Sequence, residues 1–287
     1  MGDAAKGLPN RRLGLVIGSG GLKCAASIGL WRVLEEAGIR PDMIVGCSGG
    51  SLFASCMALG WDAATIQERV FRDWTATITA RPYYRSFLRA ALPRVFGFSE
   101  RFGLIDDRHL NAALRRQLGD PRIEDLPIPL RITATDVRSG ERVVLSRWPV
   151  AEAVRASIAL PVLFRPWPIE GRLLSDGASS DPLPLSVAIR EGCDILVAMG
   201  FESTHDDRLD SLWRLIHQHT VVAGNHLLRS TFAFYSLVHH AEVIPVMPRF
   251  DRPVRLGDVA QVPSLIEEGE RSAREQLPYL QRLLSAA

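Results

Sequence analysis

The sequence predicts a layered α/β protein built around parallel strands. Two strand–turn–helix units follow each other directly near the amino terminus, and each turn is rich in glycine. Further short apolar runs alternate with helical patterns along the rest of the chain. Strands separated by helices run parallel and are joined by right-handed crossovers, so this order indicates helices packed on a parallel sheet.

The first unit begins with the strand 13–18 (LGLVIG), a short apolar run of the kind that is buried in a parallel sheet. The glycine-rich turn GSGGLK follows this strand. The segment 25–38 (AASIGLWRVLEEAG) then carries apolar residues at helical spacing, and Gly38 ends the predicted helix.

The second unit has the same order. Its strand is 42–46 (DMIVG), and its helix 51–59 (SLFASCMAL) opens at a turn around Ser48. The later pattern predicts a strand with a hairpin partner, a helix, another buried strand and a last helix, at residues 128–136, 141–146, 184–192, 194–200 and 263–284. We expect a single α/β domain over residues 1–287, in which only 81–102 fits neither pattern.

The composition argues against several classes of protein. The 34 basic and 32 acidic residues leave a formal net charge of +2, whereas a nucleic-acid-binding protein usually has a clear basic excess. The four cysteines have no zinc-type spacing, so we expect reduced thiols and no metal. No apolar run approaches the roughly 18 residues of a membrane span, and residues 1–12 lack the apolar core of a secretory signal. These observations predict a cytoplasmic location.

A nucleophile elbow is predicted at Gly46–Gly50 (GCSGG), which matches the pattern G-x-S-x-G. A strand precedes this turn and a helix follows it, as an elbow requires. The turn holds Ser48 in a strained backbone conformation, and the flanking Gly46 and Gly50 prevent collisions with neighbouring side chains. The start of the helix favours negative charge near the serine hydroxyl. Ser48 is therefore the candidate nucleophile.

The turn GSGGLK predicts an oxyanion hole at the same edge of the sheet. The backbone N–H groups of Gly18, Gly20 and Gly21 can form an anion-binding concavity at the start of a helix. A dinucleotide-binding G-x-G-x-x-G motif would need glycine where Lys23 stands, and the P-loop sequence G-K-[S/T] does not occur. Lys23 is interpreted either as a contact for a bound anion or as a solvated surface lysine.

Two kinds of residue could activate Ser48. Asp176 follows an apolar run in LLSDGASSDPLPL and begins a loop, so its carboxylate could take the serine proton directly. By itself, however, an Asp-Gly pair is more often an ordinary turn. The other option is a histidine late in the chain, for which His205 is the candidate.

The chain resembles the bacterial patatin-like phospholipases, which use a Ser-Asp dyad without histidine. The resemblance rests on five segments in the family's order, namely GSGGLKC, GCSGGS, ATDVRSGERVVLS, ASIALPVLFRP and DGA. It implies that Ser48 is the nucleophile and Asp176 the base, with the amides of Gly20, Gly21 and Leu22 as oxyanion donors. It also implies a three-layer α/β/α fold with a central, mostly parallel sheet, and hydrolysis of lipid esters without a cofactor.

The chain departs from the family's motifs at two positions. Cys24 stands where a glycine usually follows the basic residue, and its side chain is expected to narrow the approach to the oxyanion hole. Ala178 replaces the second glycine of the aspartate motif, a variant that the family tolerates.

Residues 81–102 combine aromatic side chains with several arginines in an amphipathic pattern. Such a segment can lie in a lipid headgroup layer and act as a lid over Ser48, or it can pack as a helix on the core. The first interpretation predicts peripheral contact with the inner face of the membrane.

The leading functional hypothesis is a serine acyl-ester hydrolase of phospholipids or lysophospholipids. The same dyad could instead act on a thioester, a short-chain ester or a storage polyester. A catalytically weak regulator that binds lipid is an alternative from another class, and a nucleotide-binding protein is a third. Intact glycine turns favour an enzyme, because an idle site has no need of a strained backbone.

Overall fold

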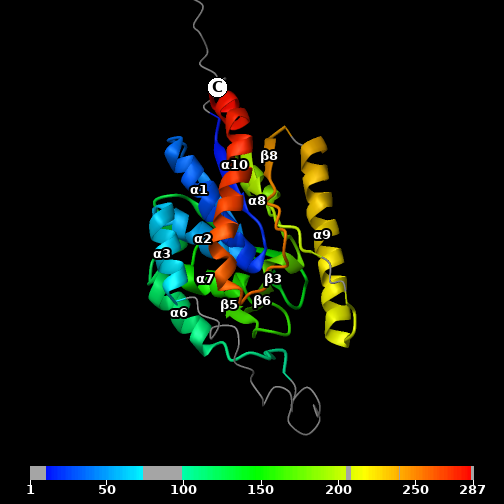
Figure 1. Ribbon diagram of the computed structural model, residues 1–287. Helices are drawn as coiled ribbons and strands as arrows, with labels where there is room; N and C mark the ends of the chain where they lie inside the picture. Colours follow the sequence, from blue (N-terminus) through cyan, green and yellow to red (C-terminus); the bar gives the residue numbers. More distant parts are fainter. Residues whose placement is uncertain (1–10, 74–98, 205–207, 239, 286–287) are drawn as a thin grey trace, which may run out of the picture.

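The computed structural model describes residues 11–73, 99–204, 208–238 and 240–285 (Figure 1). Most of the segment 81–102, the candidate lid, lies outside these residues. His205, the alternative base, also lies outside them.

A mixed, mostly parallel sheet of eight strands forms the centre of the described structure. The strands are β1 (Leu13–Ile17), β2 (Met43–Cys47), β3 (Leu130–Asp136), β4 (Arg142–Leu145), β5 (Trp167–Ile169), β6 (Arg172–Asp176), β7 (Ile195–Met199) and β8 (Glu242–Val246). Their order is β5-β6-β3-β2-β1-β7-β8, with β4 also paired to β3. Strands β3, β2, β1, β7 and β8 are parallel, so the loops that follow them emerge at one edge, which we call the carboxyl edge.

Helices cover both faces of the sheet, giving the three layers that the sequence and the resemblance predict (Figure 1). They are α1 (Ala26–Glu36), α2 (Gly49–Ala58), α3 (Ala63–Asp73), α6 (Arg108–Leu118), α7 (Val150–Ser157), α8 (Leu185–Arg190), α9 (Leu212–Val238) and α10 (Val262–Ser285). Short 3₁₀ helices are η1 (Gly21–Ala25), η3 (Ile123–Asp125), η4 (Gly177–Ser179) and η5 (Val259–Gln261). Helices α1, α2, α7 and α10 share the larger core, whereas α8 and α9 cover the opposite face.

The apolar runs form central strands because both of their faces are buried. In β1, Leu15 and Ile17 belong to the larger core while Val16, between them, belongs to the core on the other face. All three are at most 1% exposed. Such strands have no polar alternation, which is why the sequence shows continuous apolar runs. The predicted strands and helices are confirmed with ends shifted by a few residues, including the hairpin of β3 with β4.

Helices α1 and α10 touch through their backbones. A Cβ at Gly269 would lie 1.9 Å from Ala26 O, and one at Gly29 would lie 2.1 Å from Ile266 O. Neither position has room for a methyl group, so the two helices can approach this closely only with glycine at the crossing.

We expect Gly269→Ala to lower the free energy of unfolding by about 1–3 kcal/mol or more, because the helices must separate. Thermal unfolding followed by circular dichroism measures the effect. Gly224→Ala in α9 is the matched control: its Cβ meets nothing within 4 Å, so a helix-favouring residue should be neutral or slightly stabilising. Equal melting temperatures for Gly269→Ala and the wild type would contradict this account of the crossing.

Candidate active site

The turn around Ser48 has the geometry of a nucleophile elbow. Strand β2 ends at Cys47, and α2 begins at Gly49. The φ of 53° and ψ of −130° at Ser48 lie in a region that residues other than glycine rarely adopt. A Cβ at Gly50 would lie 2.4 Å from Gly18 O, so the start of α2 is in direct backbone contact with the end of β1. The surrounding backbone therefore holds Ser48 in its strained conformation.

Strand register brings Asp176 to the same place. Cys47 in β2 pairs with Thr133 in β3, and the next residue of β3, Ala134, pairs with Asp176 at the end of β6. Ser48 and Asp176 therefore lie on either side of β3 at nearly the same level. The Ser48 hydroxyl donates a hydrogen bond of 2.6 Å to Asp176 Oδ2. The other carboxylate oxygen accepts the N–H of Ala178 at 2.9 Å.

Burial makes Asp176 a stronger base than an ordinary aspartate. Its side chain is almost inaccessible, and this burial raises its pKa from 3.8 to about 6, although hydrogen bonds from Ser48 and Ala178 oppose the shift. At neutral pH most Asp176 side chains are still ionised, so the carboxylate can accept the proton of Ser48. The arrangement can therefore support nucleophilic chemistry without a third residue.

The predicted oxyanion turn lies against the elbow. A Cβ at Gly49 would lie 2.5 Å from Gly21 O, which shows how closely the two turns approach. Gly20 caps η1, and Gly21 and Leu22 begin it, so their amides lie where a helix offers no internal acceptor. The Gly18 amide differs, because it donates to Met199 O at 2.9 Å and ties β1 to β7. Gly18 is therefore removed from the predicted oxyanion donors.

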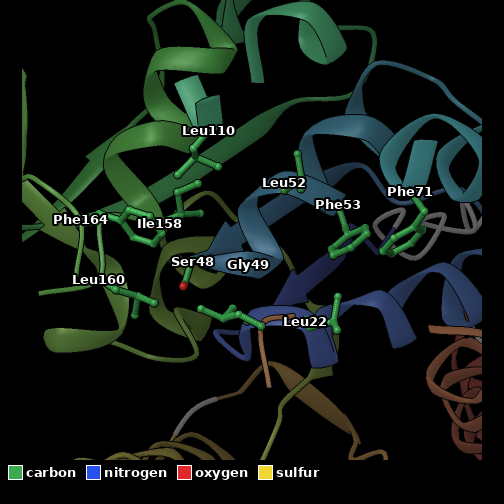
Figure 2. Close-up of a pocket in the computed structure, with 12 residues that line it drawn as sticks. Leu22, Ser48, Gly49, Leu52, Phe53, Phe71, Leu110, Ile158, Leu160 and Phe164 are labelled. Carbon is green, nitrogen blue, oxygen red and sulfur yellow. The ribbon is translucent and has the colours of Figure 1, made fainter. Parts of the chain in front are cut away.

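An apolar pocket opens beside Ser48. Its empty volume is about 590 Å³ when the open solvent space at its mouth is included. Its lining residues are Gly21, Leu22, Ser48, Gly49, Leu52, Phe53, Phe71, Leu110, Ile158, Leu160, Phe164 and Leu256. Figure 2 shows the Ser48 hydroxyl between Ile158, Leu160 and Phe164 on one side and Leu22 on the other. Ser48 contributes the pocket's only polar side chain in the described part of the chain, so the cavity suits an aliphatic group next to a reacting hydroxyl.

The family model for patatin-like phospholipases matches residues 15–189, more than half of the chain. The chain belongs to the patatin-like phospholipase family. The match includes the oxyanion turn, the elbow and the Asp176 loop, as the resemblance in the sequence predicts.

Curated relatives of this patatin-like chain come from bacteria and animals. An uncharacterized NTE family protein of Mycobacterium tuberculosis is 33% identical over 199 residues, which cover 69% of this chain and 51% of the relative. Neuropathy target esterase sws of Drosophila melanogaster is 30% identical over 207 residues, or 71% of this chain and 14% of that protein. The chain thus spans about half the length of the mycobacterial relative and a much smaller part of the insect one.

Among solved structures, VipD of Legionella pneumophila has a similar fold. The TM-score is 0.51 at 15% sequence identity, with 94% of this chain and 67% of VipD covered. This similarity supports the patatin-like layered fold.

One residue of the patatin-like site has a role that the sequence does not reveal. Ser157, at the end of α7, accepts the backbone N–H of Ser48 at 2.8 Å and donates to Thr133 O at 2.7 Å. Its hydroxyl therefore links the elbow to β3. Ser157 lies in the quoted segment ASIALPVLFRP, but the sequence gives no indication of which backbone group it binds.

We expect Ser157→Ala to lower kcat about tenfold, with KM nearly unchanged. The buried Ser48 N–H would lose its acceptor, at a cost of about 1–3 kcal/mol, and the strained turn would relax. Ser55→Ala is the matched control, since the buried Ser55 hydroxyl donates to Ser51 O within α2 and, among the described residues, does not bind the Ser48 backbone. Steady-state kinetics on a soluble ester measure both variants. Equal effects of the two substitutions would show that Ser157 has no special influence on the elbow.

Lys23 is neither solvated nor part of the pocket lining. Only 8% of the residue is exposed, and its ammonium donates to Glu202 O at 2.9 Å and Ser203 Oγ at 2.8 Å. Burial lowers the Lys23 pKa to about 8. The interpretation as a surface lysine is therefore wrong. The side chain holds η1 to the loop after β7, and an anion contact by Lys23 stays a prediction.

Cys24 does not narrow the approach to the oxyanion turn, contrary to the expectation from its unusual position. The residue is fully buried and its thiol donates to Gly18 O at 3.4 Å. A Cβ at Gly49 would lie 3.1 Å from Cys24 Sγ, so the sulfur lies between the two turns. The first turn of η1 directs the side chain at position 24 inward, away from the pocket.

Among the residues that the structure describes, no histidine lines the pocket. Within the described ranges, no group of three His, Cys, Asp or Glu residues could hold a metal ion. His219 and His226 are exposed on α9, on the other side of the sheet from the pocket.

Proposed function

We propose that this protein is a serine hydrolase of lipid carboxylic esters, of the phospholipase A or lysophospholipase type. The observation that carries the proposal is the 2.6 Å hydrogen bond from the Ser48 hydroxyl to Asp176, formed at the wall of an apolar pocket. Membership of the patatin-like phospholipase family supports the same reaction class. Its relatives include a protein named neuropathy target esterase, which agrees with ester hydrolysis.

In the proposed reaction, Ser48 Oγ attacks the ester carbonyl carbon while Asp176 takes the hydroxyl proton. The amides of Gly20, Gly21 and Leu22 donate to the oxyanion of the tetrahedral intermediate. Asp176 returns the proton to the departing alcohol or lysolipid oxygen, leaving an acyl ester on Ser48. Asp176 then takes a proton from water, which attacks this ester, and the proton returns to Ser48 as the fatty acid leaves.

The pocket supports an acyl substrate of considerable length. The carbonyl carbon must lie at Ser48, and the apolar walls formed by residues such as Leu52, Phe53 and Leu110 continue from that point. Each methylene that enters is removed from water with a gain of about 0.8 kcal/mol. A fatty acyl chain therefore fits better than a short or polar acyl group. Thioesters and storage polyesters would also place an acyl group in the pocket, so they form the second group of candidate substrates.

A fluorophosphonate probe and an acyl panel test the proposal. The probe should label the wild type at Ser48, identified by peptide mass spectrometry, and leave Ser48→Ala unlabelled. Fatty acid should be released from phosphatidylcholine or its lyso form, and kcat/KM for p-nitrophenyl esters should rise with chain length. Equal labelling of both proteins would contradict the assignment of Ser48 as the nucleophile. A preference for acetyl esters would overturn the lipid assignment, and faster cleavage of acyl thioesters would favour the second group.

A further inference from the structure

Helix α9 begins beyond the carboxyl edge of the sheet, the edge that carries Ser48. The chain leaves β7 at this edge, where Lys23 contacts Glu202 and Ser203. The Ser203 N–H donates to Asn225 Oδ1 at 2.9 Å, and Asn225 Nδ2 donates to Ser203 O at 2.8 Å. These two hydrogen bonds fix Asn225, in the middle of α9, at the level of the carboxyl edge.

The first turns of α9 are the least buried part of its amino-terminal half, as far as the described residues show. Among the described side chains of residues 212–220 none is buried, and burial begins at Val221. With a rise of 1.5 Å per residue, Leu212 lies about 20 Å along the axis from Asn225. Figure 1 shows this yellow end of α9 at the same end of the molecule as the start of α10.

Large aliphatic side chains occupy this uncovered end. We call them the apolar tip: Leu209, Leu212, Leu215 and Ile216, which are 50%, 72%, 42% and 48% exposed. Isolated exposed aliphatic residues are common, but four within eight positions, three of them on α9 and Leu209 just before it, indicate an interaction surface. No helix in the described part of the chain, α9 included, is long and apolar enough to cross a bilayer.

Basic side chains lie at the same edge. The loop between β8 and α10 contributes Leu256 to the pocket lining and carries the exposed residues Arg249, Arg252 and Arg255. The same loop also carries Asp251 and Asp258, so its three arginines exceed its acidic residues by one charge. In the part of the chain that the structure describes, none of these three arginines forms an ion pair. Arginine at a membrane surface is attracted to anionic headgroups, with about 1 kcal/mol per residue.

A bilayer fits these features better than a second copy of the chain. Stable protein interfaces use roughly 20–30 residues on each side, whereas the apolar tip has four. An apolar tip at the same end of the molecule as an arginine-bearing loop matches the boundary between acyl chains and anionic headgroups (Figure 1). The pocket opens near the same edge, and a lipid substrate must reach it from a membrane. This last step rests on the proposed function.

We propose that the apolar tip and the arginines at 249, 252 and 255 form a docking surface for anionic phospholipid bilayers. The tip enters the headgroup layer, the arginines bind lipid phosphates, and the pocket mouth is held close to its substrate.

Vesicle flotation with the Ser48→Ala protein tests this proposal without consuming the lipid. Vesicles of phosphatidylcholine alone are compared with vesicles that contain one quarter phosphatidylglycerol. Leu212→Gln/Ile216→Gln should lower the partition coefficient about tenfold or more. Arg252→Gln/Arg255→Gln should lower binding about tenfold, only on the anionic vesicles and most strongly at low salt. Circular dichroism verifies that each variant is folded.

Leu237→Gln is the matched control. Leu237 is 84% exposed on the same helix, but about 38 Å from Leu212 along its axis. It should bind vesicles as the parent does. The proposal would be overturned if Leu237→Gln lost as much binding as the tip variant, or if the tip variant bound vesicles as the parent does. It would also be overturned if light scattering showed that the parent is a dimer and the tip variant a monomer.

A second readout separates failure of docking from failure of the proposed function. With Ser48 intact, the tip variant should hydrolyse a soluble short-chain ester at the wild-type rate and vesicle phospholipid at least tenfold more slowly. A wild type that binds vesicles but hydrolyses neither substrate would overturn the function and leave docking supported. Equal hydrolysis of vesicles by both proteins would overturn docking alone.

Discussion

Asp176→Asn should lower kcat for ester hydrolysis by about 10²–10⁴-fold, the range over which a positioned general base contributes. Asparagine has nearly the same shape and can still accept the Ala178 N–H, but its amide cannot take the proton that Ser48 Oγ gives to Asp176 Oδ2. Steady-state kinetics on a soluble ester, with Ser48→Ala as background, measure the loss. Retention of most activity would transfer the role of base to a histidine such as His205.

The pH profile gives an independent test of the same assignment. Because burial raises the pKa of Asp176 to about 6, the wild-type kcat/KM should fall tenfold per pH unit below about pH 6 and level off above it. The active form is the carboxylate, so protonation removes activity and the loss lies on the acid side. This inflection should be absent from the residual activity of Asp176→Asn.

The raised pKa also predicts how stability changes. Folded Asp176 holds its proton up to about pH 6, whereas the unfolded chain releases it near 3.8. The folded state therefore loses stability as the pH rises through this window, and the cost of the buried charge is fully present at pH 8. Asp176→Asn removes that cost and should melt at the same temperature as the wild type or higher at pH 8. A large decrease would contradict a destabilising carboxylate.

Gly50→Ala should lower kcat at least about 10²-fold and also lower the melting temperature. The new Cβ would lie 2.4 Å from Gly18 O and 2.5 Å from Ile17 O, which are backbone atoms at the end of β1. Relief of this clash must move the elbow away from the oxyanion turn. A displacement of about 1 Å between reacting groups is enough for such a loss of rate.

Kinetics and thermal unfolding of Gly50→Ala measure both effects, and Gly224→Ala again provides a glycine replacement in open space. A variant with lowered stability but unchanged kcat would show that the two turns move together. In that case their fixed separation would not be required for the reaction.

Local patterns in the sequence predicted most of the elements that form the site. The runs LGLVIG and DMIVG are almost wholly apolar because β1 and β2 are buried on both faces, and the glycine turns follow them directly. Each prediction depended on neighbouring residues alone. The roles of Gly18 and Cys24 could not be predicted in this way, since the Gly18 amide binds Met199 and the Cys24 thiol lies between two turns.

The sequence by itself determined the two strand–turn–helix units, the strained position of Ser48 and the glycines that make it accessible, because these depend on steric requirements within a few residues. Only the tertiary structure decided which distant groups reach Ser48. Asp176 and Ser157 arrive there through strand register and the end of α7. The exposure of the apolar tip is likewise decided by the packing of other elements around α9. Such contacts join residues more than a hundred positions apart, and packing of the whole sheet fixes them.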